Sequence, residues 1–202
     1  MEIRDVIHGT IEISGSERQI IESPFFQRLR NIKQLGFAEN SYPGATHNRF
    51  IHSVGAMHLS GIAFDHALRL PKSYSKKTKG DQASGTRAEN TNESLLNRKP
   101  KDARRFRAAL RAAAMLHDIG HGPLSHTTEF AMPMVEKLEL KTLACAPGKP
   151  CSWSAKRQAN HEDYTIKIVL QSPLTAVLKR AFGGLGVEPI HIACIINEEI
   201  VC

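Results

Sequence analysis

The most informative stretch of this 202-residue chain is His117–His126, where three histidines and one aspartate follow an alanine-rich apolar segment. Neighbouring residues of a helix point apart, but the glycines at 120 and 122 end the helical backbone. The adjacent His117 and Asp118 can therefore face one ion. Imidazole nitrogens and carboxylate oxygens are ligands of divalent metals. The spacing predicts one part of a metal site.

A second segment, Asn48–Ser53, supplies another candidate ligand. Its His52 opens a long stretch in which apolar residues recur with helical spacing, and Arg49 precedes it by three residues, near enough to hold an anion beside the metal. Together, His52, His117 and Asp118 suit a divalent ion such as Fe, Mn, Zn, Co, Ni or Mg, with coordination positions left open for water and substrate. An ion so bound acidifies water and polarises phosphoryl oxygens, which predicts phosphoester hydrolysis.

These segments, in this order, resemble the HD superfamily of metal-dependent phosphohydrolases, whose metal ligands come as His, then His-Asp, then a distant Asp. The resemblance is closest to the deoxynucleoside triphosphate (dNTP) triphosphohydrolases, which include dGTPase-like enzymes. It covers residues 1–70 and 103–202. The motifs that carry it are DVIHGTIEI at 5–13, PFFQRLRNIKQLG at 24–36 and YPGATHNRF at 42–50. It implies a hydrolase that converts a dNTP to a deoxynucleoside and triphosphate.

The resemblance also implies catalytic roles beyond the metal ligands. By similarity, His126 would protonate the leaving 5′ oxygen, and His121 and His161 would contact phosphates and position water. His161 also begins a predicted helix. Glu129 lies three residues after His126, a spacing at which a carboxylate can stabilise an imidazolium. The family usually has Asp at the position of Glu129, one methylene shorter.

Two further groups of residues match nucleotide-binding positions of the family. Gln34 and Arg49 match positions that bind the sugar and the phosphates, and arginine suits the latter because its planar fork pairs with two phosphoryl oxygens. Glu22, Gln27 and Arg30 match a guanine-reading regulatory site, which implies an activating nucleotide. The family often has Asp at the position of Glu22. An ordinary helix surface is the alternative interpretation of these three residues.

The sequence pattern predicts an all-α fold, the HD-domain helical bundle, with a short N-terminal β-hairpin at residues 6–13. Ser23-Pro24 is typical of a helix start, and that helix is expected to run to Gly36. Another helix follows His52. Further helices are expected at about 103–117, 124–140, 161–171, 173–182 and 189–201, with a loop at 141–160.

The net charge of +7 is concentrated in one segment. Residues 71–107 hold eleven of the 27 Lys and Arg residues but four of the 20 Asp and Glu residues, and the rest of the chain is balanced. We interpret residues 71–102 as a flexible basic insertion within a single HD domain at 1–202. A tether for nucleic acid or another polyanion is the less favoured interpretation, because the chain lacks a globally basic face.

Other features of the sequence indicate where in the cell the protein is expected and what its cysteines are expected to do. The chain has neither an apolar run of membrane-spanning length nor a signal-peptide pattern, so we expect a cytoplasmic protein that has no membrane partner. The cysteines at 145, 151, 194 and 202 lack the spacing of zinc ligands, and Cys194 is expected in the core because apolar residues flank it.

The family's fourth metal ligand is an Asp downstream of the segment that resembles residues 187–201, and this chain ends at Cys202. We therefore expect the N-terminal part of a longer enzyme, although a naturally short version is the alternative. The first hypothesis is a metal-dependent dNTP triphosphohydrolase that binds dNTPs and forms a homo-oligomer. The alternatives are an HD phosphohydrolase acting on another nucleotide or phosphoester, and a catalytically silent nucleotide-binding or oligomerisation module.

Overall fold

The computed structural model describes residues 1–68, 100–140 and 156–200. Within these ranges the chain is mostly helical with one two-stranded sheet, which confirms the predicted all-α class and N-terminal hairpin. The α-helices and strands are β1 (Glu2–Asp5), β2 (Gly9–Glu12), α1 (Gly15–Ile21), α2 (Pro24–Gln27), α3 (Arg49–Ala67), α4 (Pro100–Leu116), α5 (His161–Gln171), α6 (Pro173–Phe182) and α7 (Pro189–Ile196). The 3-10 helices are η1 (Arg28–Asn31), η2 (Gly36–Asn40), η4 (Ser125–Ala131), η5 (Val135–Leu138) and η7 (Gly183–Leu185).

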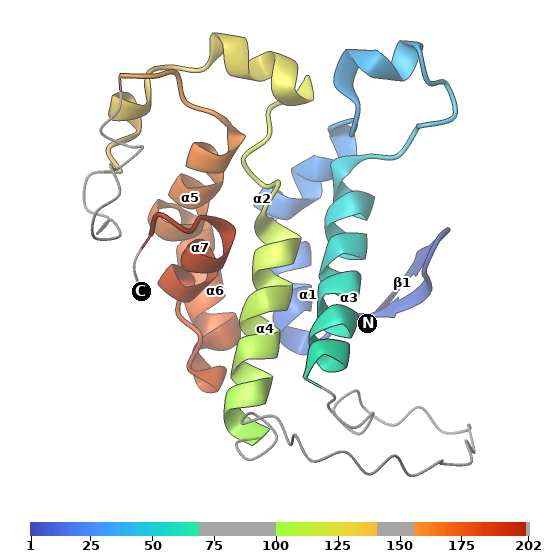
Figure 1. The fold of residues 1–202 in the computed structure, drawn as a ribbon, viewed down its shortest axis with the longest axis vertical. Coiled ribbons are helices and arrows are strands. Elements are labelled where there is room, and N and C mark those ends of the chain that lie inside the picture. The colour runs from blue at the N-terminus through green and yellow to red at the C-terminus, as the bar shows by residue number, and fades with distance from the viewer. Residues whose placement is uncertain (69–99, 141–155, 201–202) are drawn as a thin grey trace.

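Helices α3 and α4 lie side by side and run in opposite directions (Figure 1). The first turn of α3 therefore lies beside the last turn of α4, at the end of the molecule that also holds η2 and η4. We call this region the site end. Asn48 fixes the start of α3, because its side-chain oxygen accepts a hydrogen bond from the backbone N–H of Ile51 at 3.1 Å.

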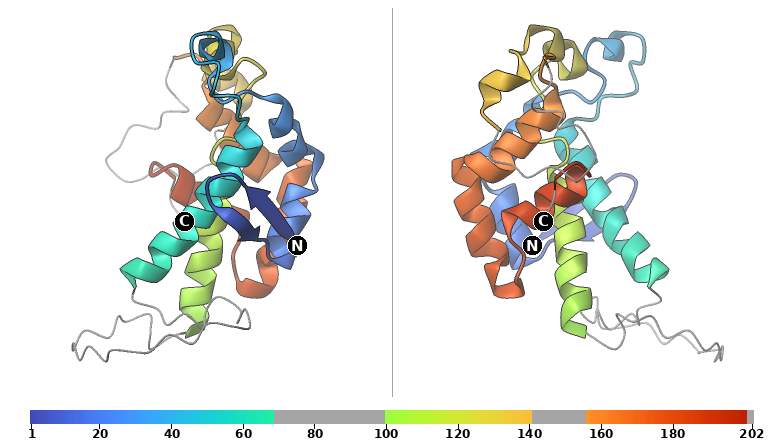
Figure 2. Two further views of the ribbon diagram at one scale, coloured as in Figure 1. Left: turned by 90° about the vertical axis from the view of Figure 1, so that its right-hand side faces the viewer. Right: turned by 60° about the vertical axis from the view of Figure 1, so that its left-hand side comes forward.

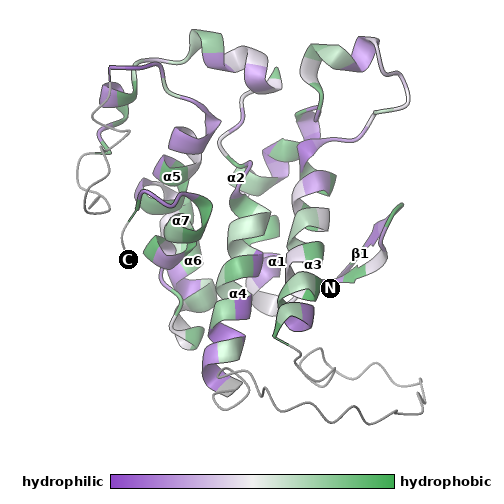
Figure 3. Ribbon diagram, viewed as in Figure 1, coloured by the Kyte–Doolittle hydropathy of each residue, from purple (hydrophilic) through white to green (hydrophobic). Residues whose placement is uncertain are grey.

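The core lies around α4, with α3 on one side and α5, α6 and α7 on the other (Figures 1 and 3). Helix α4 is mainly apolar in the half nearer the site end and hydrophilic towards its other end (Figure 3). Its small buried residues Ala109, Ala112 and Ala113 allow neighbouring helices to approach closely. Local signals set the other helix starts: Ser172 caps α6 ahead of Pro173, and Asn160 caps α5.

The hairpin lies beside α3 (Figure 2) and contributes Ile11 to the core. Glu2 pairs with Glu12 and Asp5 with Gly9, so the strands lie on either side of a turn at residues 6–8. The Asp5 carboxylate accepts hydrogen bonds from two N–H groups of that turn, and Gly9 has a φ of 69°. The prediction of a hairpin is correct, but its first strand begins at residue 2 rather than 6.

The predicted helix at 24–36 is wrong beyond Asn31. Helix α2 continues as η1, and then Ile32 becomes extended. Lys33 forms a β-bridge with Asn48, and the N–H of Arg49 donates to the carbonyl of Ile32 at 2.9 Å. Pairing with the segment before α3 replaces helical hydrogen bonds, so tertiary contacts override the helical pattern here.

The predicted helix at 124–140 is also wrong, because the chain forms η4 and η5 with an extended stretch between them. Pro133 lies in that stretch and has no N–H for a helical hydrogen bond. Met134 instead forms a β-bridge with Gln158. Helix α7 ends at Ile196, five residues before the predicted end, and α1 was not predicted.

Some predictions fall outside the described residues. These are most of the insertion at 71–102, most of the loop at 141–160, and Cys145, Cys151 and Cys202. Helix α4 already includes residues 100–102, which the prediction had assigned to the insertion. Cys194 is half-buried and packs against the core, as predicted. Among the described helices, none is both long and apolar enough to cross a membrane.

Candidate metal centre and adjoining histidine group

The three predicted metal ligands meet at the site end. His52 lies in the first turn of α3, and His117 and Asp118 follow the last residue of α4. The Nε2 atoms of the two histidines are 3.3 Å apart, and the Asp118 carboxylate oxygens lie 3.3 Å from His117 Nε2 and 3.5 Å from His52 Nε2. All three ligand atoms lie within 4.8 Å of one another. We call these three residues the first group, and they could hold a divalent ion.

The protonation of the first group suits a metal site. The Nδ1 atom of His117 lies 2.7 Å from the carbonyl oxygen of Ala114. Since a carbonyl only accepts, Nδ1 donates this hydrogen bond, and Nε2 is the nitrogen that faces the other two ligands. Burial lowers the pKa of His52, helped by the charges of His117 and Arg49 and opposed by Asp118. A neutral imidazole is the form that binds metal.

Asp118 is buried and ionised. Burial alone raises the pKa of its carboxyl, but attraction by His121, His117 and Arg49 outweighs this and holds the pKa well below its usual range. Its closest partner is Nη1 of Arg49, 2.5 Å from Oδ2, and Arg49 is itself 2% exposed. The site end therefore contains a buried ion pair next to the candidate metal position.

Arg49 also links three segments. Its Nη2 donates to Oγ of Ser125 and, at 3.4 Å, to the backbone carbonyl of Gln34. Ser125 has a φ of 56°, which turns the chain so that its hydroxyl faces Arg49 and Gln34. Two buried polar atoms here, Nε of Arg49 and Oε1 of Gln34, have no hydrogen-bond partner among the described residues.

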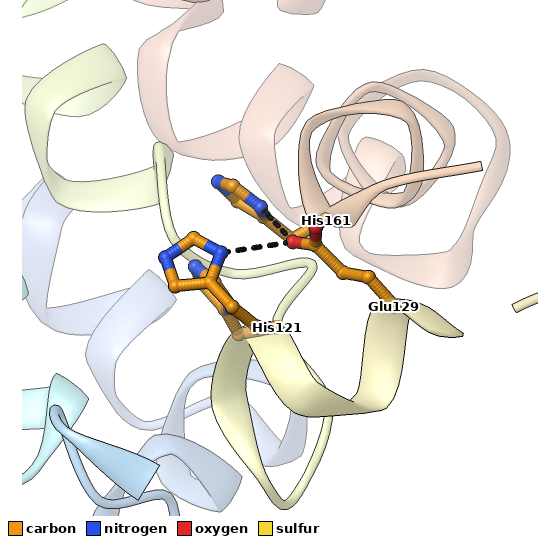
Figure 4. A group of neighbouring side chains, drawn as sticks. His121, Glu129 and His161 are labelled. Carbon is orange, nitrogen blue, oxygen red and sulfur yellow. Dashed lines mark hydrogen bonds and ion pairs between the residues drawn. The ribbon is translucent and has the colours of Figure 1, made fainter. Parts of the chain in front are cut away.

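The predicted catalytic residues form a second group of four side chains. His121 lies in the turn after α4, His126 and Glu129 lie in η4, and His161 begins α5. Their ligand atoms also lie within 4.8 Å of one another. Figure 4 shows the Glu129 carboxylate directed towards the imidazoles, and its Oε1 is 2.5 Å from Nδ1 of His161 and 3.1 Å from Nδ1 of His126. These four residues are called the second group below.

Electrostatics within the second group favour an ionised carboxylate and a neutral central histidine. Contacts with His161 and His126 outweigh burial and lower the pKa of Glu129. Burial lowers the pKa of His121 to about 4; contact with Asp118 opposes this shift, and the charges of His161 and Arg49 add to it. The rings of His121 and His161 are stacked, with centroids 3.8 Å apart. Asp118 connects the two groups, since its Oδ1 is 3.5 Å from Nε2 of His121.

Several residues that position the second group were not predicted from the sequence. Arg28 donates to the carbonyls of Ile119 and His121, the latter at 2.6 Å, and so fixes the turn after α4. Thr165 of α5 donates to the carbonyl of His117 at 3.0 Å and accepts from the N–H of Gly120 at 2.9 Å. In the sequence, the only local feature that could have indicated this close contact between α5 and the turn after α4 is the pair of glycines, Gly120 and Gly122, among the histidines of that turn.

The predicted regulatory residues lie on α2, η1 and the end of α1. Gln27 accepts from Arg30 at 2.8 Å, whereas Glu22 is paired with Arg18 at 2.6 Å. The guanidinium of Arg30 lies 3.6 Å from the ring centroid of Phe50. The structure thus brings Gln27 and Arg30 together, while Glu22 contacts a different side chain.

The fold and the two groups define a helical bundle with a candidate metal centre of His and His-Asp ligands, and comparison with known proteins gives its family. No family model matches the chain. The human deoxynucleoside triphosphate triphosphohydrolase SAMHD1 is 30% identical over 98% of this chain and 25% of its own length. The bovine protein of that name is 36% identical over 69% of this chain and 19% of its length. The homolog from Dictyostelium discoideum is 30% identical over 83% of this chain and 24% of its own length.

An uncharacterized protein of Methanocaldococcus jannaschii is 37% identical over 63% of this chain and 20% of its own length. The chain belongs to the HD-domain dNTP triphosphohydrolase-like family, as its motifs predicted. It spans about a quarter or less of the length of these relatives.

Proposed function

We propose that this protein hydrolyses dNTPs to deoxynucleoside and triphosphate in a metal-dependent reaction. The observation that carries the proposal is the arrangement of the site end, where three potential metal ligands lie directly beside a group of histidines and a glutamate that can transfer protons. The family supports the choice of substrate, because its relatives are named as dNTP triphosphohydrolases.

His52, His117 and Asp118 would hold the ion. Bound there, a divalent ion supplies an acidified water and polarises a phosphoryl oxygen. The three side chains leave coordination positions free, which a catalytic centre needs. Arg49 keeps Asp118 ionised, and we assign its unpartnered Nε to a substrate phosphate oxygen. Gln34 is assigned to the sugar, through the buried side-chain oxygen that has no partner among the described residues.

In the proposed reaction, water adds to the α-phosphorus and the bond between this phosphorus and the 5′ oxygen breaks. His126 gives its proton to the departing 5′ oxygen, and Glu129 stabilises the imidazolium through the 3.1 Å contact with Nδ1. His161 and His121 bind phosphate oxygens and orient the water. A cavity of about 400 Å³ lined in part by His126, Glu129 and Asn160 is within the size range of small-molecule sites.

The test is to incubate the purified chain with each dNTP and Mn²⁺ and to separate the phosphate products by anion-exchange chromatography. We expect triphosphate and deoxynucleoside, and we expect both to disappear in His117→Ala. His66→Ala is the matched control, because His66 is exposed on α3 and belongs to neither group. Orthophosphate or pyrophosphate as the product would instead identify an HD phosphohydrolase of different specificity.

If the chain binds Mn²⁺ and dNTP without turnover, the same assay on a chain extended past Cys202 decides the remaining question. Turnover by the extended chain would assign the activity to the longer enzyme. Its absence there would reject the hydrolase proposal in favour of a silent nucleotide-binding module.

A further inference from the structure

The second group has the composition of a metal site in its own right. Three imidazoles and one carboxylate, from His121, His126, Glu129 and His161, bring their ligand atoms within 4.8 Å of one another. They come from three separate segments, the turn after α4, η4 and the first residue of α5. The group shares no residue with the first group.

The polar atoms of His121 are the second observation. Its side chain is 1% exposed; Nε2 lies 3.5 Å from Oδ1 of Asp118, and Nδ1 has no hydrogen-bond partner among the described residues. Leaving a nitrogen of a buried imidazole unpaired is unfavourable, and such groups in native proteins usually have a ligand, water or ion. The side chains around His121 in this group are themselves potential metal ligands. An ion bound among them would give the His121 nitrogen that faces the group a coordination partner.

We propose that the second group is a second divalent-metal site, closed by four protein ligands and selective for Zn²⁺. Four ligands of nitrogen and oxygen type complete the tetrahedral shell that zinc prefers. The first group offers three ligands and stays open to water and substrate, as a catalytic site does. The two groups therefore differ in ligand count, and this difference predicts a catalytic ion at the first and a closed, non-catalytic ion at the second.

The geometry requires only small side-chain movements for zinc to bind. Bonds of roughly 2.0–2.2 Å place tetrahedral ligands about 3.3 Å apart. The Glu129 oxygen is now 2.5 Å and 3.1 Å from the Nδ1 atoms of His161 and His126, with a proton between each pair. Zinc would replace these two protons and widen both separations. The stacked ring of His121 must rotate away from His161, towards the ion.

The two ions are expected to weaken each other's binding. Asp118 lies between the groups, with Oδ1 3.3 Å from Nε2 of His117 and 3.5 Å from Nε2 of His121. An ion at either group places positive charge close to the other group. The second equivalent of Zn²⁺ should therefore be acquired at a higher concentration than the first.

Occupation of the second group would stop hydrolysis, and this consequence rests on the proposed function. With zinc at Nδ1 of His126, the ring keeps its Nε2–H but cannot be an imidazolium, and Glu129 binds the ion instead of stabilising that charge. His126 is then a much weaker acid towards the leaving oxygen. Zinc would act as an inhibitor at concentrations that fill the second group, whereas Mn²⁺, which prefers oxygen-rich ligand sets, would not.

Metal content tests the site without any need for activity. Purified protein is dialysed against a series of Zn²⁺ concentrations, and bound zinc is measured by inductively coupled plasma mass spectrometry. We expect two zinc ions in the wild type, one in His117→Ala and one in the double variant Glu129→Gln/His161→Ala, which leaves the second group with two ligands. His66→Ala controls for surface histidines and should keep two. Circular dichroism establishes that each variant is folded.

Cobalt substitution tests the closed geometry. Tetrahedral Co²⁺ absorbs visible light much more strongly than six-coordinate Co²⁺, so the second equivalent of Co²⁺ should add an intense band that the Glu129→Gln/His161→Ala variant lacks. A wild type that never binds more than one ion, or a folded Glu129→Gln/His161→Ala variant that still binds two, would overturn the site. A second equivalent of Co²⁺ that adds only weak bands would overturn its closed, tetrahedral shell.

Inhibition is measured separately, on Mn²⁺-loaded protein with added Zn²⁺. We expect at least a tenfold loss of rate as the second zinc binds, with retained Mn²⁺ measured in the same samples. Two bound metals with an unchanged rate would reject inhibition. If Mn²⁺ alone supports no turnover, the hydrolase proposal fails, while the metal stoichiometry still decides the second site.

Discussion

The site end and the helical body of this protein are held together by different interactions. In the body, α4, α5, α6 and α7 pack apolar side chains such as Met115, Ile166 and Leu178 against one another, and all three are fully buried. At the site end, polar contacts of buried and half-buried groups dominate: Arg49 with Asp118, half-buried Arg28 with two backbone carbonyls, and Thr165 with the turn after α4.

This difference has a physical consequence for mutation. Apolar packing spreads stability over many weak contacts, so the loss of one side chain is partly absorbed by its neighbours. A buried charge or a close backbone contact has one specific partner, and removal of one member leaves the other unsatisfied. Substitutions at the site end should therefore cost more stability per atom than substitutions of apolar side chains in the body.

The largest effect is expected for Asp118→Ala in metal-free protein. The change leaves Arg49, which is 2% exposed, as an unpaired buried charge, and we expect a loss of about 3 to 5 kcal/mol in the free energy of unfolding. Urea unfolding measures it. The double variant with Arg49→Met removes both charges and should recover much of the loss. Equal destabilisation of the single and double variants would show that the ion pair does not control this region.

The next effect is expected for Gly120→Ala. A Cβ at this position would lie 2.5 Å from the N atom of Thr165 and 2.8 Å from its Oγ1, besides contacting the His161 carbonyl. We expect a loss of roughly 2 to 3 kcal/mol, because α5 must move away from the turn. Gly184→Ala is the control, since a Cβ there meets open space, and it should stay within about 0.5 kcal/mol. A tolerated Gly120→Ala would mean that the contact is loose.

The same difference explains what could be predicted from the sequence. Helices α5 and α6 were predicted at their observed bounds, because a cap at Asn160 and the Ser172-Pro173 pair are local signals. The histidines and carboxylates that the structure brings together were also identified, since their residue types and order carry the family pattern, while their roles stay predictions. Their supports Arg28 and Thr165 were missed, because each acts on backbone atoms of a segment remote in sequence.

An intermediate effect is expected for Arg28→Lys. Lysine keeps the charge but has a single donor group, which cannot reach the carbonyls of Ile119 and His121 with the geometry of the guanidinium. We expect a loss of about 1.5 kcal/mol in unfolding free energy and weaker uptake of the second zinc ion. Arg18→Lys, in an exposed pair with Glu22, should cost less than about 0.5 kcal/mol. A similar cost for both variants would contradict a special role for Arg28.

The smallest effect is expected for Glu17, and it tests the helical body. The Glu17 carboxylate accepts a hydrogen bond from Arg111 at 2.6 Å and another from the backbone N–H of Ser14, the N-cap of α1. Burial alone raises the pKa of Glu17, but contacts with Arg111 and Ser14 lower it by more than burial raises it. The pKa in the folded protein therefore lies below the ordinary value of 4.5. Because the folded pKa is depressed, this stabilisation is complete above pH 4.5 and is lost as pH falls through the folded pKa. We expect Glu17→Gln to cost about 1 kcal/mol at pH 7, since glutamine still accepts from Arg111.

The difference between wild type and Glu17→Gln should then shrink below pH 4.5, where the wild-type carboxyl begins to be protonated in the unfolded chain. Urea midpoints measured from pH 7 to pH 3 provide the test, with Glu12→Gln, an exposed residue of β2, as the control. A pH-independent difference would mean that Glu17 stabilises the body through its shape and packing rather than its charge. The charged contacts of the body would then matter even less than the comparison with the site end supposes.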